Sequence, residues 1–99
     1  MITYVRVRTV KAGNFQGAVD FLKRYKEFIS SEFGIDANFG VELGRLGTIV
    51  SLNTFENAQA WEDSLVKLRS NSKYAEMLDE SAKYFEDEVV EHLITDLPL

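Results

Sequence analysis

The stretch ANFGVELGRLGTIVSLN, residues 37–53, decides the fold of this chain. In its first part every second residue is apolar, which places one set of side chains on a single face: Ala37, Phe39, Val41 and Leu43. Alternation with a period of two is typical of a β-strand that buries one face. Residues 44–47, GRLG, predict a tight turn, and residues 48–53 predict a returning strand. The centre of the chain is therefore expected to be a β-hairpin.

Helical patterns flank this hairpin on both sides. Residues 15–33 repeat apolar side chains at helical spacing, after Asn14 as the expected N-cap. Gly34 is suited to end this helix because glycine accepts the left-handed conformation at that position. A second helical region begins near residues 56–57, is interrupted at residues 70–72, and then resumes. We therefore expect one helix before the hairpin and one divided helical region after it.

Two further strands complete the pattern. Residues 2–10 are rich in β-branched and aromatic types, and residues 89–95 predict a last strand after a solvated acidic turn at residues 86–88. The order β-α-β-β-α-β is that of ferredoxin-like α+β domains, in which helices cover one face of a four-stranded antiparallel sheet. The length of 99 residues, without a linker or repeat, predicts a single domain over residues 1–99.

One face of this sheet would have no helix over it. The first strand carries Tyr4, Arg6 and Arg8 on one face and Val5 and Val7 on the other. We expect the helices to cover the two valines. Apolar side chains would still remain on the open face, and an apolar sheet face is usually covered, most simply by a second copy of the chain. The pattern therefore predicts a homodimer that forms through the sheet face.

The composition excludes several classes of function. The formal net charge is −5 and no basic cluster occurs, so we expect neither nucleic acid nor an anionic membrane surface as a partner. The absence of cysteine excludes disulfides, zinc ribbons and thiol nucleophiles, and a single histidine leaves no pattern for a metal site. We recognise no signal peptide and no membrane-spanning run, so we expect a cytoplasmic protein. The absence of cysteine and the single histidine lead us to expect no metal or other cofactor.

The segment LNTFENAQAW, residues 52–61, resembles the strand end, aromatic residue, cap and tryptophan-bearing helix of the dimeric α+β barrel proteins. The segment NSKY, residues 71–74, is similar to their interruption of the second helix before a tyrosine. The resemblance covers essentially the whole chain and implies two ferredoxin-like subunits packed sheet against sheet. The group includes antibiotic-biosynthesis-type monooxygenases, haem-degrading monooxygenases, muconolactone-isomerase-like enzymes and NIPSNAP-like proteins, so the fold alone implies no single activity.

Two enzyme branches of this group can be compared with the chain. The haem-degrading branch needs a histidine ligand after Trp61, where residues 70–72 stand instead, and the only histidine is His92. The cofactor-independent monooxygenases resemble the chain in placing Asn57 and Trp61 one helical turn apart. In such an enzyme the amide would polarise a phenolate or quinone oxygen and the indole would bond to the intermediate. The chain departs from that branch at Lys67, where a tyrosine is expected.

Two hypotheses about function follow. In the first, the protein binds a small aromatic or carbonyl-bearing molecule between sheet and helices, and activity as a cofactor-independent monooxygenase or isomerase is open. Its expected catalytic residues are His92 as base, Asn57 and Trp61, and its expected ligand-binding residues are Tyr4, Arg6, Arg8 and Asn53. In the second hypothesis, the same fold is a non-catalytic binding or assembly module whose interior is filled by side chains.

The candidate residues also have plain structural explanations. Trp61 shares an apolar helical stripe, Asn57 suits a helix cap, and His92 suits a half-buried position on a strand. Arg6 and Arg8 would need partners if a dimer enclosed their face, because an unpaired buried charge is costly. The candidate partners are Glu42, Glu91 or an anionic or carbonyl-bearing ligand, and a filled interior with both arginines paired to glutamate would exclude the first hypothesis. A cavity large enough for an aromatic ring, beside Trp61 and Arg6, distinguishes the first hypothesis from the second.

Overall fold

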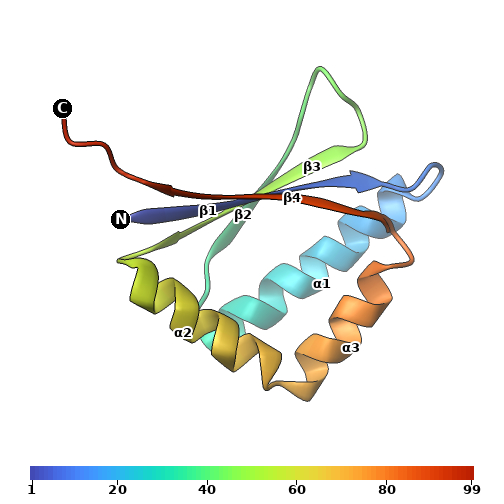
Figure 1. Ribbon diagram of the computed structural model, residues 1–99. Coiled ribbons are helices and arrows are strands. Elements are labelled where there is room, and N and C mark those ends of the chain that lie inside the picture. Colours follow the sequence, from blue (N-terminus) through green and yellow to red (C-terminus); the bar gives the residue numbers. More distant parts are fainter.

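A computed structural model describes all residues, 1–99, as a four-stranded antiparallel sheet with three helices on one face (Figure 1). The elements in chain order are β1 (Ile2–Val10), α1 (Phe15–Phe33), β2 (Ala37–Val41), β3 (Thr48–Phe55), α2 (Ala58–Arg69), α3 (Ser72–Ser81) and β4 (Phe85–Thr95). The strand order is β2-β3-β1-β4. The ferredoxin-like α+β fold predicted from the sequence is confirmed. None of the helices has the length and apolar character needed to cross a membrane.

The division of the second helical region follows from two asparagine caps. The side-chain oxygen of Asn57 accepts a hydrogen bond from the Ala60 N–H at 2.8 Å, which starts α2. The side-chain oxygen of Asn71 accepts one from the Tyr74 N–H at 3.0 Å, which starts α3. The first N–H groups of a helix have no partner within the helix, so each asparagine supplies one. The interruption predicted at residues 70–72 is therefore the start of a separate helix.

The ends of α1 differ in how well the sequence predicted them. Gly34 has φ of 66° and its N–H donates to the Ser30 carbonyl at 3.0 Å, as expected for a left-handed glycine that ends a helix. Asn14 does precede the helix, but its side chain makes no capping bond. Its amide donates instead to the Lys83 carbonyl at 3.0 Å. This bond connects the start of α1 to the loop that leads into β4.

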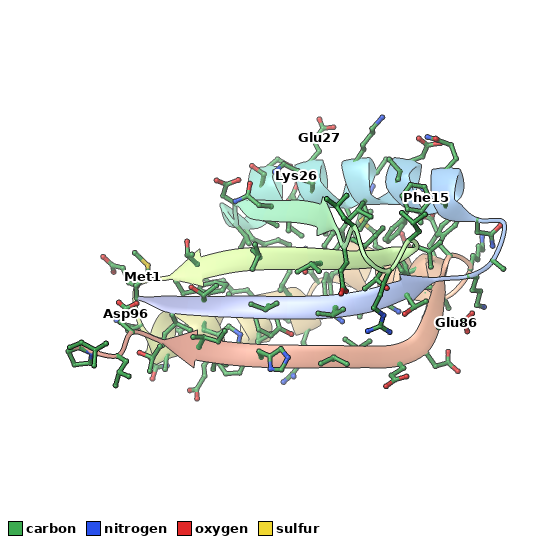
Figure 2. The ribbon with its side chains drawn as sticks, turned by 90° about the horizontal axis from the view of Figure 1, so that it is seen from above. Met1, Phe15, Lys26, Glu27, Glu86 and Asp96 are labelled. Carbon is green, nitrogen blue, oxygen red and sulfur yellow. The ribbon has the colours of Figure 1, made fainter.

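The start of β4 corrects the sequence expectation. The strand begins at Phe85, which pairs with Val10 of β1, and the acidic run at residues 86–88 lies within the strand and not in a turn. The pairing register shifts between Arg8 and Val10, and the chain bends near Glu86 (Figure 2). Because β4 is an edge strand, its acidic side chains stay exposed, as is common on sheet edges.

The sheet faces the helices with the side opposite to the one expected. The helices cover Tyr4, Arg6 and Arg8, which line the space beneath the sheet. Val5 and Val7 therefore point to the open face, because neighbouring residues of a strand point to opposite sides. The expectation that the helices cover the two valines was wrong.

Long amphipathic side chains explain this orientation. The ring of Tyr4 lies 5.9 Å from the ring of Trp61 on α2, measured between centroids. The guanidinium carbon of Arg8 lies 4.6 Å from the centre of the Phe85 ring. Tyrosine and arginine can pack their apolar parts against other apolar groups while the polar ends reach partners elsewhere. Side chains of this length span the space between sheet and helices, which a valine would leave empty.

The open face of the sheet is apolar at its centre. Figure 2 looks onto this face, with no helix in front of it. Cross-strand partners point to the same side, and the register places Val50 and Val90 beside Val7, and Leu52 and His92 beside Val5. The aliphatic side chains gathered on the open face are Val5, Val7, Val50, Leu52, Val90 and Ile94. They form a continuous surface that we call the valine face.

The hydrophobic core on the other side is divided. One cluster contains Phe21 and Phe85, and a second contains Ile29 and Leu68. Only 12 of the 99 residues are buried. Tyr25, Phe28 and Phe39 are partly buried and pack against both clusters, so they connect the two.

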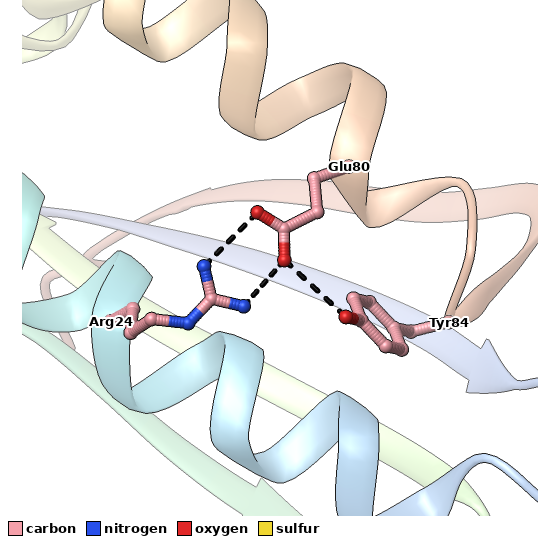
Figure 3. A network of polar contacts seen from close by, with 3 residues as sticks. All are labelled: Arg24, Glu80 and Tyr84. Carbon is pink, nitrogen blue, oxygen red and sulfur yellow. Dashed lines mark hydrogen bonds and ion pairs between the residues drawn. The ribbon is translucent and has the colours of Figure 1, made fainter.

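A polar network holds α1 against α3 (Figure 3). Arg24 of α1 donates two hydrogen bonds to the carboxylate of Glu80 on α3, one of them at 3.0 Å, and the Tyr84 hydroxyl donates to the same carboxylate at 3.3 Å. These hydrogen bonds raise the pKa of Arg24 and lower the pKa of Glu80. The network is exposed to solvent, so we assign it a role in orienting the two helices and not a large share of the stability.

Candidate functional site

A cavity of about 300 Å³ lies between the helix-covered face of the sheet and the three helices. Its walls are mostly apolar, and its polar groups come chiefly from β1. This volume is at the lower end of the range typical of small-molecule pockets. The interior is therefore not filled by side chains, which is the state that the first of the two functional hypotheses requires.

The polar residues of β1 are spaced regularly along the cavity. Tyr4, Arg6 and Arg8 follow one another at intervals of about 7 Å, because every second side chain of a strand points to the same side. Arg6 occupies the middle position, where Ser51 of β3 and Glu91 of β4 are its neighbours across the sheet. The cavity thus has an aromatic end at Tyr4 and a cationic end at Arg8.

Trp61 forms the aromatic end together with Tyr4. The cap at Asn57 starts α2 one turn earlier and so places the indole over the sheet, with its ring tilted by 58° to the Tyr4 ring. Asn53, directly opposite Tyr4 on β3, also lines this end. The indole N–H of Trp61 is buried and has no hydrogen-bond acceptor. A ligand oxygen at this end could accept from it.

Arg6 is paired with an acidic residue, although incompletely. Its Nε atom lies 3.3 Å from a carboxylate oxygen of Glu91, which is close enough for an ion pair. The N–H is not directed at that oxygen, so the buried Nε still lacks a hydrogen-bond acceptor. The charge of Arg6 is thus balanced by Glu91, while one of its donors remains unused.

Arg8 has no such acidic partner. No carboxylate oxygen lies within 4.0 Å of its guanidinium, and its polar contact is a long hydrogen bond of 3.5 Å from Nη2 to the backbone carbonyl of Glu86. Its Nε is buried without an acceptor. Burial, and then the nearby charge of Arg6, lower the pKa of Arg8. An arginine keeps its charge in proteins, so this end of the cavity carries a positive charge without a counter-ion.

The cavity and the whole chain carry charges of opposite sign. Arg6, Arg8 and Arg69 contribute three positive charges to the cavity wall, and Glu91 contributes one negative charge, which gives a balance of +2. The chain as a whole has a formal net charge of −5. The positive cavity is thus a local feature, created by the side of β1 that faces the helices.

Two tyrosines of the cavity are held in the neutral form. Burial is the main cause that raises the pKa of Tyr4 to about 12, while Arg6 acts in the opposite direction and Glu91 raises it further. Burial also raises the pKa of Tyr25, which lies next to Tyr74 with ring centroids 6.4 Å apart. Neutral phenols are hydrogen-bond donors and not bases, so Tyr4 and Tyr25 are suited to hold a ligand oxygen.

The structure brings most of the expected site residues together. The ones that line the cavity are Tyr4, Arg6, Arg8, Asn53 and Trp61. Asn57 and His92, expected in the same site, do not line it. The side-chain oxygen of Asn57 caps α2, and His92 lies across from Val5, in the valine face. His92 pairs with Val5 of β1, and paired residues point to the same side of the sheet. Because Val5 points away from the helices, His92 also points away from the cavity.

Other polar residues of the cavity were missed from the sequence. They are Tyr25, Ser51, Ser64, Arg69, Tyr74 and Ser81. Tyr25 offers the one usable signal, because its hydroxyl sits on the otherwise apolar stripe of α1. The others could be found only from the three-dimensional arrangement of α2, α3 and β3.

Comparison with known proteins shows the fold. No protein-family model and no curated protein sequence matches the chain. Among solved structures, it is similar to a NIPSNAP domain protein from Burkholderia xenovorans, with a TM-score of 0.84 and 10% identity, over 98% of this chain and 95% of the other. It is also similar to SnoaB, a cofactor-independent oxygenase from Streptomyces nogalater, with a TM-score of 0.74 and 13% identity, over 99% and 94%. An antibiotic biosynthesis monooxygenase gives a TM-score of 0.77 at 10% identity, over 99% and 100%.

The chain thus shares the fold of the NIPSNAP and antibiotic-biosynthesis-monooxygenase proteins. This confirms the resemblance that the sequence suggested. At such low identity the likeness establishes the backbone arrangement, and the chemistry has to be argued from the side chains of this cavity.

The role of Asn57 as a cap leads to a first prediction. Asn57→Ala removes the bond to the Ala60 N–H and should lower the free energy of unfolding by about 1 kcal/mol. Asn57→Ser keeps a capping oxygen and should retain most of that stability. Urea denaturation followed by circular dichroism measures both. A ligand that binds the wild type but not the stably folded Asn57→Ser variant would contradict a purely structural role.

The raised pKa of Tyr4 leads to a second prediction. The fold favours the neutral phenol, so this contribution to stability is complete below the ordinary tyrosine pKa of about 10. It is lost as the pH rises from there through about 12. Tyr4→Phe should remove a late-titrating part of the phenolate absorbance and reduce the alkaline loss of stability. If Tyr4→Phe and the wild type give the same absorbance titration above about pH 11, Tyr4 is not held neutral by its surroundings.

Proposed function

We propose that this protein binds a small aromatic or carbonyl-bearing molecule in the cavity between its sheet and its helices. One observation supports this proposal above all. Three side chains of the cavity wall, those of Arg6, Arg8 and Trp61, each have a buried N–H donor without an acceptor in the protein. Leaving such a donor unpaired costs about 1–3 kcal/mol. A ligand oxygen would satisfy a donor that the fold leaves unused.

The same donors suit the chemistry of a cofactor-independent oxygenase or isomerase. In that proposal a proton passes from a phenol, or from the carbon next to a carbonyl, to Glu91, the carboxylate of the cavity wall. The donors of Trp61, at the aromatic end of the cavity, and of Arg6, in its middle, then stabilise the resulting anion. The anion reacts with molecular oxygen in an oxygenase, or is reprotonated at a different atom in an isomerase. Glu91 takes the role of base here in place of His92, which lies outside the cavity.

We also propose that the protein forms a homodimer through the valine face. Leu52, Val90 and Ile94 are 42%, 43% and 53% exposed in the single chain. An antiparallel sheet with one face in water normally carries polar side chains there, whereas the centre of this face is aliphatic. A second copy offers a surface of the same curvature and chemistry, and a two-fold axis would bury both faces at once.

The binding proposal can be tested with the single tryptophan of the chain. Phenols, quinones and small aromatic carbonyl compounds that enter the cavity should change the fluorescence of Trp61. Ser51→Leu places an apolar side chain in the middle of the cavity and should weaken binding at least about tenfold by filling the space. Fluorescence titration and calorimetry measure the affinity.

Ser30→Leu serves as the matched control, because Ser30 is exposed on α1 and does not line the cavity. Equal affinities of the two variants would place binding outside the cavity. For catalysis, compounds that bind are followed by oxygen uptake or by conversion to an isomer. Glu91→Gln should abolish turnover while binding persists. Binding without any turnover would identify a binding module and not an enzyme.

The dimer proposal has its own test. Light scattering at micromolar concentration should give twice the mass of one chain, and Leu52→Glu should give a folded monomer because it places two charges in the buried interface. The control is Leu46→Glu, a change at a leucine that is 87% exposed in the β2–β3 turn. A monomeric wild type, or equal effects of both substitutions, would refute an interface on the valine face.

A further inference from the structure

We propose that the ligand of the cavity is an anion, an aryl-alkyl carboxylate whose carboxylate binds Arg8 and whose ring lies beside Trp61. This inference rests on the proposed binding function and adds the charge and the orientation of the ligand. It follows from the different surroundings of the two arginines, from the charge of the cavity wall, and from the distance between the two ends of the cavity.

The two arginines differ in their counter-ions. Arg6 has the carboxylate of Glu91 at 3.3 Å, whereas no carboxylate oxygen lies within 4.0 Å of Arg8. Asp87 is the acidic side chain that acts on Arg8 through space, but it forms no ion pair with it. A charge that is partly removed from water is costly unless it is paired. A ligand carboxylate would supply to Arg8 what Glu91 supplies to Arg6.

The remaining contacts of Arg8 leave room for this partner. The contact with the backbone of Glu86 uses Nη2, and the Phe85 ring packs against the guanidinium at 4.6 Å. The Nε donor is unused. The terminal nitrogen Nη1 makes no hydrogen bond and is not among the buried atoms without a partner. Guanidinium groups present their donors in a planar fork that matches a carboxylate, so the carboxylate can accept from Nη1 and from a second N–H of the same group.

The charge of the cavity wall favours an anion over a neutral ligand. The wall carries a balance of +2, in a chain whose formal net charge is −5. A neutral carbonyl oxygen can accept hydrogen bonds from Arg8, but it supplies no counter-charge to the guanidinium. A carboxylate makes charge-assisted hydrogen bonds, which are about twice as strong as those between neutral groups.

The ends of the cavity define the orientation. Tyr4 and Arg8 are four residues apart on β1, or about 13 Å along the strand. The flat aromatic wall formed by Tyr4 and Trp61 is thus distant from the unpaired cation. An elongated ligand with a ring at one end and a carboxylate at the other fits both. A hydroxyl on the ring would also meet the unused N–H of Trp61.

The test compares a carboxylate with its neutral isostere. The probes are para-hydroxyphenylpropionate, its primary amide and the neutral phenol para-ethylphenol, titrated by Trp61 fluorescence and calorimetry. The acid should bind about 10-fold to 100-fold more tightly than the amide, in line with the strength of hydrogen bonds to charged groups. Arg8→Gln should remove this preference, and Arg8→Lys should keep part of it. Arg45→Gln is the matched control, because Arg45 is exposed in the β2–β3 turn.

The outcomes separate this inference from the proposed function. A preference for the acid that disappears in Arg8→Gln and persists in Arg45→Gln supports the proposal. If acid and amide bind equally, or if the preference survives in Arg8→Gln, the anion at Arg8 is refuted while the cavity remains a binding site. If none of the three probes changes the fluorescence or releases heat at millimolar concentration, both proposals fail. Circular dichroism of each variant verifies that Arg8→Gln and Arg8→Lys are folded, and Arg8→Lys provides a charged side chain if the glutamine variant unfolds.

Discussion

The structure depends on the placement of two arginines on the helix-facing side of the central strand. Arg6 and Arg8 lie on β1, which has a neighbouring strand on each side, and both side chains are partly buried. Long charged side chains in that position need space and partners. Two core clusters pack the helices onto the sheet, and residues of both clusters line the cavity into which the arginines extend.

The same placement determines the character of the opposite face. Because side chains alternate along β1, turning Arg6 and Arg8 inward turns Val5 and Val7 outward. The pairing of β3 and β4 with β1 then adds Val50 and Leu52, and with them Val90 and Ile94, to the same surface. The charged groups in the cavity and the apolar open face are thus two consequences of one register. A change that slid β1 by a single residue would exchange them, so the proposed ligand site and the proposed dimer interface depend on the same strand register.

The sequence could predict the elements of the fold but not which side of β1 faces the helices. The elements and their order follow from local patterns, and the asparagine before Ala58 and the glycine at residue 34 mark helix ends through their own hydrogen bonds or conformation. Alternation shows which residues share a face but not which face meets the helices. That choice depends on how well Tyr4 and Arg8 pack against Trp61 and Phe85, and these contacts join segments far apart in the chain. The expectation for β1 therefore failed, and the one for His92 failed with it.

The sequence resemblance to dimeric α+β barrel proteins rests mainly on α2, whereas the polar groups of this cavity come mainly from β1. Of the pair Asn57 and Trp61, only the tryptophan lines the cavity, since the asparagine is used to start the helix. The structural neighbours share the backbone at 10–13% identity, a level at which cavity walls can change completely while the fold persists. The helix supplies the aromatic surface of the cavity, and the strand supplies its unpaired positive charge. In the binding that we propose, Arg8 therefore determines which ligands are selected more than does the helix that carries the family resemblance.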